Sequence, residues 1–156
     1  MTNPKYMAYA AADPYFAIIR QGLAGLVDGG HYFDAFADDA VFEFRYDFPG
    51  LPRTFNGRDA LMAFFSGYCG HIVINSADAL VVHRPVDPRV VIIEYDVHGK
   101  IIATGAPYDN RFISVVTIED RKIVHWRDYM DSLAAMTALS APGKKGAQRK
   151  RKRAGS

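Results

Sequence analysis

Apolar residues recur at helical spacing in the first half of the chain. A helix is predicted to begin at a cap provided by Asp13, with Pro14 in its first turn, and to end before Gly29 and Gly30. A short helical segment is expected at about 31–37. The buried stripe of the first helix consists of Phe16, Ile19, Leu23 and Leu26, and a later helix at about 59–68 turns inward Leu61, Phe64, Phe65 and Tyr68.

Alternation of apolar and polar residues replaces helical spacing elsewhere. Residues 40–46 form a predicted strand with one aromatic face, made of Phe42, Phe44 and Tyr46. After Gly70, turn residues separate strands predicted at about 72–76, 79–84, 89–102, 108–119 and 122–130. Short connections between long strands favour antiparallel hairpins. A last helix is expected at about 132–139.

Helices followed by a long run of strands are typical of an α+β domain. We predict a cone-shaped barrel, in which a strongly curved antiparallel or mixed sheet wraps on three to four helices, as in cystatin-like folds. This domain would occupy residues 1–141, and residues 142–156 would form a basic, disordered tail. Such a sheet encloses an apolar cavity, which is the natural site for a small molecule.

Composition and charge narrow the expected partners. The 156 residues suit one domain, and no run approaches the roughly 18 apolar residues of a membrane span. Residues 144–156 hold seven of the 19 basic residues, which leaves twelve against 17 acidic residues elsewhere. Because the domain itself is acidic, nucleic acid is not the expected partner, and we interpret the tail as an extension that either solubilises the protein or binds anionic partners loosely. The single cysteine, Cys69, cannot form an internal disulfide, so we expect a cytoplasmic protein without a structural metal. We also expect no cofactor.

The two faces of the last strand separate apolar from polar residues. One face carries Val124, Trp126, Asp128 and Met130, and the other carries Ile123, His125, Arg127 and Tyr129. The first face should point into the cavity, which makes Asp128 a lone carboxylate among hydrophobic side chains. Burial would raise the pKa of Asp128 toward neutrality and suit it to general acid/base catalysis. The alternative is a structural role, capping a backbone group or pairing with an arginine.

The same parity argument selects further cavity residues. The predicted substrate-binding set is Phe42, Phe44, Tyr46, Phe64, Tyr68, His71, Tyr95, Asn110, Phe112, Ser114, Trp126 and Met130. Ser114, Asn110 or one of the tyrosines could stabilise a developing oxyanion. Other charged residues fall on the opposite sheet face and are expected to form an outer or dimer-interface network, namely Glu94, Asp96, Arg111 and Arg127.

Three segments resemble the nuclear transport factor 2-like, SnoaL-like superfamily. Residues 36–42 (Phe-Ala-Asp-Asp-Ala-Val-Phe) resemble its helix-to-strand signature, Gly57–Ala60 its next helix start, and Glu119–Asp131 its closing hairpin. The resemblance covers about residues 10–140. It implies the cone-shaped α+β fold and a homodimer packed through the outer sheet faces.

Two relatives within that superfamily resemble the chain most. Residues 94–101 and 138–142 are similar to the phenazine-biosynthesis A/B family, whose acidic residue on the last strand matches Asp128. The histidine and serine of that family's third helix appear here as Phe64 and Tyr68. The run from Trp126 to Tyr129 is similar to limonene-epoxide hydrolase, whose catalytic aspartate also matches Asp128.

The helper residues of epoxide hydrolysis are replaced. Its partner arginine and second aspartate fall on Tyr95 and Val97, and its water-holding tyrosine and asparagine fall on Phe42 and Phe44. Epoxide hydrolysis is therefore the less favoured activity. The ketosteroid isomerase base also falls on or beside Phe44. SnoaL-type polyketide cyclases, which use an acid/base aspartate, fit Asp128 without the missing helpers.

These observations predict a cofactor-independent enzyme that acts on a small hydrophobic cyclic molecule. Asp128 would transfer the proton in a cyclisation, isomerisation, condensation or elimination. The alternative is a non-catalytic protein of the same fold, either a binder of hydrophobic ligands or a dimeric scaffold.

Overall fold

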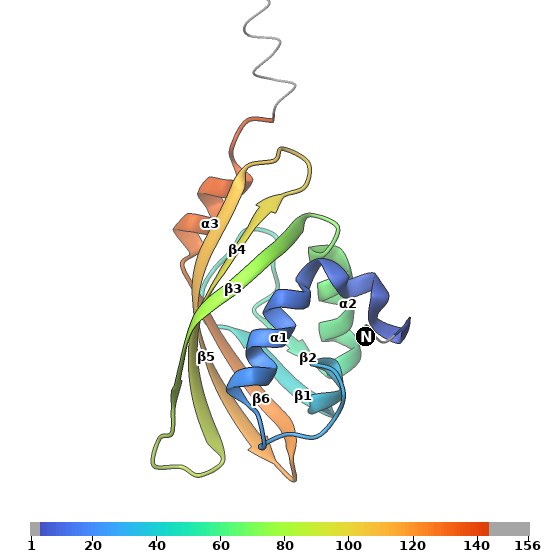
Figure 1. Cartoon of the computed structure of the whole chain (residues 1–156), viewed down its shortest axis with the longest axis vertical. Coiled ribbons are helices and arrows are strands. Elements are labelled where there is room, and N and C mark those ends of the chain that lie inside the picture. The colour runs from blue at the N-terminus through green and yellow to red at the C-terminus, as the bar shows by residue number, and fades with distance from the viewer. Residues whose placement is uncertain (1–3, 144–156) are drawn as a thin grey trace, which may run out of the picture.

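A computed structural model describes residues 4–143 of the chain. Three α-helices and six strands form the domain, together with two 3₁₀ segments (Figure 1). In chain order these are η1 (Pro4–Ala12), α1 (Asp13–Gly22), η2 (Phe33–Ala35), β1 (Phe36–Phe44), β2 (Thr54–Asn56), α2 (Arg58–Tyr68), β3 (Ile72–His83), β4 (Val90–Ile101), β5 (Pro107–Glu119), β6 (Lys122–Met130) and α3 (Ser132–Leu139). The predicted tail lies outside the described residues, apart from its first two positions.

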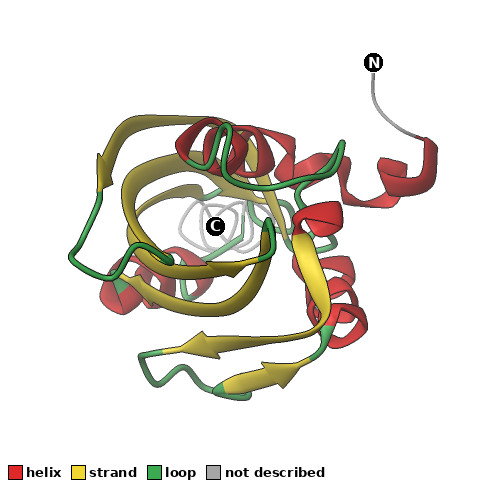
Figure 2. Cartoon of the chain, turned by 90° about the horizontal axis from the view of Figure 1, so that it is seen from below, coloured by secondary structure: helices red, strands yellow, loops and turns green. Residues whose placement is uncertain are grey.

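One mixed sheet contains all six strands in the order β2-β1-β6-β5-β4-β3. β1 and β6 pair in parallel, and every other neighbouring pair is antiparallel. Seen along the long axis of the molecule, the strands curl through a large part of a circle (Figure 2). Helices α1 and α2 lie on the concave side, and α3 lies at the end where β4 and β5 join (Figure 1). The predicted α+β fold with a curved mixed sheet is confirmed.

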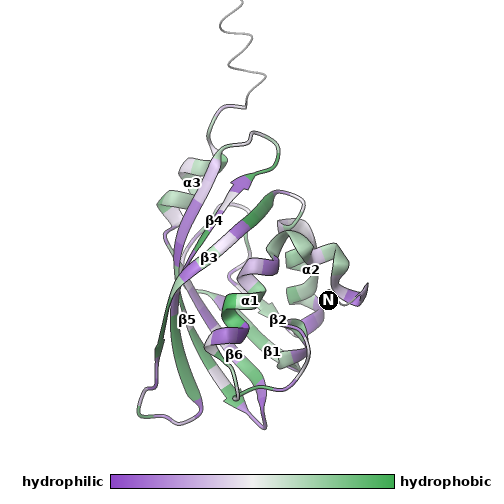
Figure 3. Ribbon diagram, viewed as in Figure 1, coloured by the Kyte–Doolittle hydropathy of each residue, from purple (hydrophilic) through white to green (hydrophobic). Residues whose placement is uncertain are grey.

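Alternation along the strands builds the core as predicted. Every second residue of β4 is buried, from Val91 to Val97, and the residues between them are partly exposed. Figure 3 shows hydrophobic and hydrophilic stretches along the strands, with the lower part of the sheet mostly hydrophobic. Because side chains point to opposite faces with a period of two, this pattern turns one face of the sheet toward the helices.

The beginning of the chain differs from the prediction in two ways. Asp13 is the first residue of α1 and not its cap; Ala12 holds the cap position, because η1 leads directly into the helix. Pro14 does lie in the first turn, as predicted. The helix ends at Gly22, and Leu23 follows in a turn that still buries its side chain.

The segment from residue 31 to residue 37 is only partly helical. Its helix is the short η2, and β1 begins at Phe36 because that residue already pairs with Ile123 of β6. Tertiary pairing with a distant strand has overridden the local pattern here. The short strand β2 was not predicted; it pairs with β1 along Val41–Glu43.

Bulges explain the remaining differences. The two strands predicted between residues 72 and 84 are one strand, β3, whose pairing with β4 shifts near Ala79, a residue with a positive φ of 57°. A second shift, between Thr117 and Ile118 of β5, leaves Val124 of β6 unpaired. For this reason Ile123 is buried, against the predicted parity, while the parity of Trp126 and Asp128 holds.

Candidate active site

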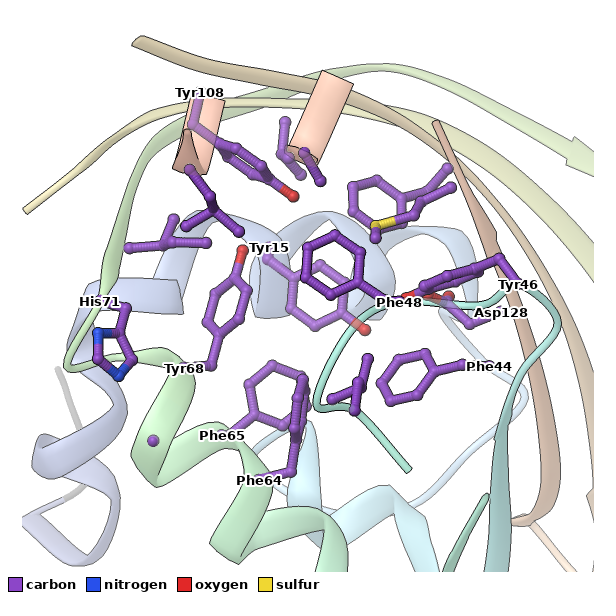
Figure 4. A pocket seen from close by; sticks show the side chains of 18 of the residues that line it. Tyr15, Phe44, Tyr46, Phe48, Phe64, Phe65, Tyr68, His71, Tyr108 and Asp128 are labelled. Carbon is purple, nitrogen blue, oxygen red and sulfur yellow. The ribbon is translucent and has the colours of Figure 1, made fainter. Parts of the chain in front are cut away.

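A cavity of about 340 Å³ lies between the concave face of the sheet and the helices. Its wall is overwhelmingly apolar and aromatic (Figure 4). An engineered cavity of about 150 Å³ holds benzene, so this space suits a molecule of about two rings. The lining residues are Tyr15, Phe42, Phe44, Tyr46, Phe48, Leu51, Phe64, Phe65, Gly67, Tyr68, His71, Ile72, Val97, Tyr108, Phe112, Asp128, Met130, Ala135 and Leu139.

Asp128 is the one carboxylate in this wall. It projects inward from β6 and is 3% exposed. Its Oδ1 accepts hydrogen bonds from Ser114 Oγ at 2.9 Å and from Trp126 Nε1 at 3.0 Å. No donor from residues 4–143 bonds to Oδ2, and this oxygen is not completely buried. The second oxygen is therefore the one available to a ligand.

Burial raises the pKa of Asp128 from its ordinary value of 3.8 to about 7. The cause is loss of hydration around the charged form, and the two hydrogen bonds from Trp126 and Ser114 oppose it only in part. A carboxyl group with this pKa is present in both protonation states near neutral pH. Such a group can accept a proton and return it.

A hydrogen-bond chain behind Asp128 has a defined direction. Ser114 has one hydroxyl proton and gives it to the carboxylate. The Tyr95 hydroxyl lies 2.8 Å from the same Ser114 oxygen, so Tyr95 is the donor in that bond. Ser114 is fully buried and Tyr95 is 1% exposed. The chain therefore holds Oδ1 in place from the side away from the cavity.

Two tyrosine hydroxyls are further polar groups of the wall. The Tyr15 hydroxyl lies 3.1 Å from that of Tyr32, in the buried layer under α1. Tyr108 accepts a hydrogen bond from Asn110 Nδ2 at 3.1 Å, and its hydroxyl points into the cavity close to that of Tyr68 (Figure 4). Asp128 and Tyr46 lie at one side of the cavity, and Tyr68, Tyr108 and His71 lie at the other.

Comparison with known proteins agrees with this architecture. Residues 15–126 match the SnoaL-like domain family. The chain belongs to this family. A relative from Bacillus subtilis, YesE, is 37% identical over 102 residues, which are 65% of this chain and 69% of that protein.

Two further similar proteins have names that refer to a biosynthetic family or to an activity. A PhzA/B-like protein of Pseudomonas aeruginosa is 28% identical over 112 residues, covering 72% of this chain and 79% of its own length. A crystal structure from Bacillus subtilis, provisionally named an isomerase, superposes with a TM-score of 0.69 at 28% identity and covers 91% of this chain and 99% of its own. The predicted resemblance to SnoaL-like proteins and to the phenazine-biosynthesis A/B family is confirmed.

The SnoaL-like domain brings most of the predicted site residues to the cavity. Those in its wall are Phe42, Phe44, Tyr46, Phe64, Tyr68, His71, Phe112 and Met130, together with Asp128. Tyr95, Asn110, Ser114 and Trp126 are buried but do not line it. Each of these four makes a hydrogen bond to a neighbouring buried group. They support the site from behind, and direct substrate contact is not what their positions favour.

Several lining residues were not predicted from the sequence. Tyr15 comes from α1, and Tyr108 is the second residue of β5. Phe48 and Leu51 lie in the loop after β1. Helical spacing selected the stripe of α1 that includes Phe16 and passed over Tyr15 beside it. Tyr108 shares the parity of Asn110, which was a signal that could have found it.

The charged residues expected outside the cavity do lie there. Glu94 Oε2 is 2.6 Å from His83 Nε2, and Arg111 Nη2 is 3.5 Å from Asp131 Oδ2. Asp96 lies opposite Arg111 in the register of β4 and β5. These groups do not reach the chemistry at Asp128.

The described part of the chain offers neither a metal-binding cluster nor a helix that could span a membrane. No three His, Cys, Asp or Glu side chains within residues 4–143 gather closely enough to hold a metal ion. None of the helices found there is long and apolar enough to cross a membrane.

Proposed function

We propose that this SnoaL-like protein is a cofactor-independent enzyme that moves a proton on a small apolar cyclic substrate, with Asp128 as the acid/base group. The observation that carries the proposal is the free Oδ2 of a buried carboxyl group, whose pKa is raised to about 7 inside an aromatic cavity. The fold relatives named as an isomerase and as a phenazine A/B-like protein are consistent with such chemistry.

The steps follow from the geometry. Ionised Asp128 takes a proton from a carbon of the bound substrate through Oδ2, while Oδ1 keeps its bonds to Ser114 and Trp126. The neutral acid then returns the proton to another atom of the substrate. Cyclisation, isomerisation, condensation and elimination can each use this exchange. A well-placed proton-transfer group contributes about 10²–10⁴ in rate.

Hydrogen exchange tests the proposal without knowledge of the natural substrate. In D₂O the α-protons of 2-tetralone, an enolisable bicyclic ketone, should exchange faster with the protein than without it. Asp128→Asn should abolish about 10²-fold or more of that acceleration. Asp39→Asn removes an exposed carboxylate of β1 and should leave the rate unchanged. Equal rates for the wild type and Asp128→Asn would refute the acid/base assignment.

A non-catalytic role in ligand binding is the second candidate. It is favoured by one observation: Asp128 is the one acidic group in the wall, and aromatic residues surround it. In that case 2-tetralone would bind in the cavity, but the exchange of its α-protons would not be accelerated.

We further propose that the protein forms a homodimer, in which the partner is a second copy of this chain. Val81, Ile113 and Tyr129 form a row across the outer face of the sheet and are 47%, 43% and 39% exposed. Light scattering should report a dimer, and Ile113→Lys should convert it to a monomer. Val86→Lys, in the loop after β3, is the matched control and should stay dimeric. A monomeric wild type would refute this interface.

A further inference from the structure

The orientation of the Asn110 amide is fixed by its neighbours. Its Oδ1 accepts hydrogen bonds from the backbone N–H groups of Arg111 at 2.8 Å and Asp131 at 3.1 Å. The opposite end of the amide, Nδ2, is therefore the donor end. It bonds to Tyr108 Oη at 3.1 Å and to Met130 Sδ at 3.4 Å. Asn110 is 3% exposed, so water has little access to this arrangement.

This fixed amide leaves Tyr108 with one available proton. An amide N–H can only donate, so the Tyr108 oxygen is the acceptor in its bond with Asn110. The Tyr108 O–H must then donate elsewhere. Tyr108 is itself 2% exposed, and its hydroxyl points into the cavity beside that of Tyr68 (Figure 4). The nearest acceptor is the Tyr68 hydroxyl, which interacts with that of Tyr108. Because one hydrogen bond between two hydroxyls uses only one of their two protons, the pair keeps one proton for a ligand.

Three other polar groups that could stabilise an oxyanion already donate to buried neighbours. Ser114 gives its proton to Asp128, and Tyr95 gives its proton to Ser114. The Asn110 amide N–H donates to Tyr108. Tyr46 lies beside Asp128 on the other side of the cavity (Figure 4). Tyr108 is thus the donor that the structure holds ready at a distance from the acid/base group.

We propose that Tyr108, held by Asn110 and accompanied by Tyr68, is a binding subsite for an acceptor oxygen of the ligand, a carbonyl or phenol oxygen. This deepens the proposed function, because it names the polar group that the substrate carries at the end opposite Asp128. The subsite supplies neutral donors and no fixed positive charge, so it suits a ketone or phenol and not a fully charged carboxylate.

The spacing of the two ends defines the ligand. Tyr108 and Ser114 lie on the same strand, six positions apart, and Ser114 pairs directly with Asp128. At about 3.3 Å per residue this is at most about 20 Å between the backbones. The side chains of Tyr108 and Asp128 both line the cavity. Tyr108 and Asp128 lie at opposite sides of the cavity (Figure 4), so a substrate held by both carries its oxygen several bonds away from the carbon that exchanges a proton, as a conjugated bicyclic or tricyclic molecule can. In the probe 2-tetralone the exchanging carbons adjoin the carbonyl, so this smaller molecule contacts Asp128 and Tyr108 in two different poses.

A pair of matched probes tests the subsite. 2-Tetralone and tetralin have nearly the same shape and differ by one carbonyl group. Their dissociation constants are measured by equilibrium dialysis for the wild type and for Tyr108→Phe. We expect the preference for the ketone over the hydrocarbon to fall about 5–10-fold in Tyr108→Phe, as for the loss of one neutral hydrogen bond. Because each variant provides its own ratio, a general change in packing cancels.

Two further variants separate this proposal from the acid/base assignment. Tyr15→Phe removes a lining hydroxyl that is shared with Tyr32 and should leave the ratio unchanged. Asp128→Asn should also leave it unchanged, even if exchange of the ketone is lost. The infrared C=O stretch of bound 2-tetralone should move to higher frequency in Tyr108→Phe. An unchanged ratio and stretch in Tyr108→Phe, or no binding of the ketone to the wild type, would overturn the subsite.

Discussion

Replacement of the buried carboxyl group should make the protein more stable at alkaline pH. In the unfolded chain Asp128 titrates near 3.8, and in the folded protein its pKa is about 7. Between these values the unfolded chain releases a proton that the folded protein keeps. The folded state therefore binds more protons, and the free energy of unfolding falls as the pH rises through this window.

The size of this effect follows from the shift. About three pKa units correspond to about 4 kcal/mol at 1.36 kcal/mol per unit, the full loss being reached above pH 7. About 1.6 kcal/mol of it is already present at pH 5. Asp128→Asn carries no such penalty, and its amide oxygen can still accept the bonds from Ser114 and Trp126. The stability advantage of the variant should grow by about 2.5 kcal/mol between pH 5 and pH 8.

Urea unfolding of both proteins at intervals from pH 5 to pH 9 measures this difference. Other titrating groups are common to both proteins and cancel in the subtraction. Asp39→Asn, on the exposed side of β1, should differ from the wild type by a constant amount at every pH. A difference between Asp128→Asn and the wild type that does not change with pH would refute the argument that burial has raised this pKa.

Three further changes test other parts of the structure. Ser114→Ala removes a bond to the charged carboxylate, so the pKa of Asp128 should rise by about one unit further, measured by carbon NMR of the carboxyl group; a fall would contradict this. Gly99→Ala would place a Cβ 2.0 Å from a backbone oxygen of β3 and should lower stability by about 1–3 kcal/mol, whereas Gly67→Ala in α2 meets nothing within 4 Å and should raise it by up to about 1 kcal/mol. Hydrogen bonds to aspartates on β5 and β3 raise the pKa of His98 above 6.5, so its stabilising effect should be lost as the pH rises through that pKa; an NMR titration midpoint that 1 M salt does not lower would count against this cause.

The inward position of Asp128 could be predicted because it depends on the chain near it. Side chains in a strand alternate, and Trp126 and Asp128 share one parity regardless of which strand lies beside them. The same argument found Tyr95 and Ser114 on the inner face. It did not tell whether they would line the cavity or lie under its wall. That distinction depends on which neighbouring side chains cover them.

Two bulges and the missed Tyr15 show where local patterns fail. The buried position of Ile123 follows from the shift in pairing between β5 and β6, and the single course of β3 depends on the irregularity at Ala79. Tyr15 lines the cavity because α1 lies across the concave face of the sheet. Each of these features is set by a partner far away in the chain.

The amino-acid sequence by itself determined the α+β class, the family resemblance and the inward carboxylate, since periodicity and motifs are properties of adjacent residues. Only the tertiary structure decided which oxygen of Asp128 is free and which hydroxyls donate to other buried groups. It also decided that Tyr108 lies across the cavity from the carboxylate. Hydrogen-bond direction depends on every donor and acceptor within reach, and the folded chain brings these together from β4, β5 and β6.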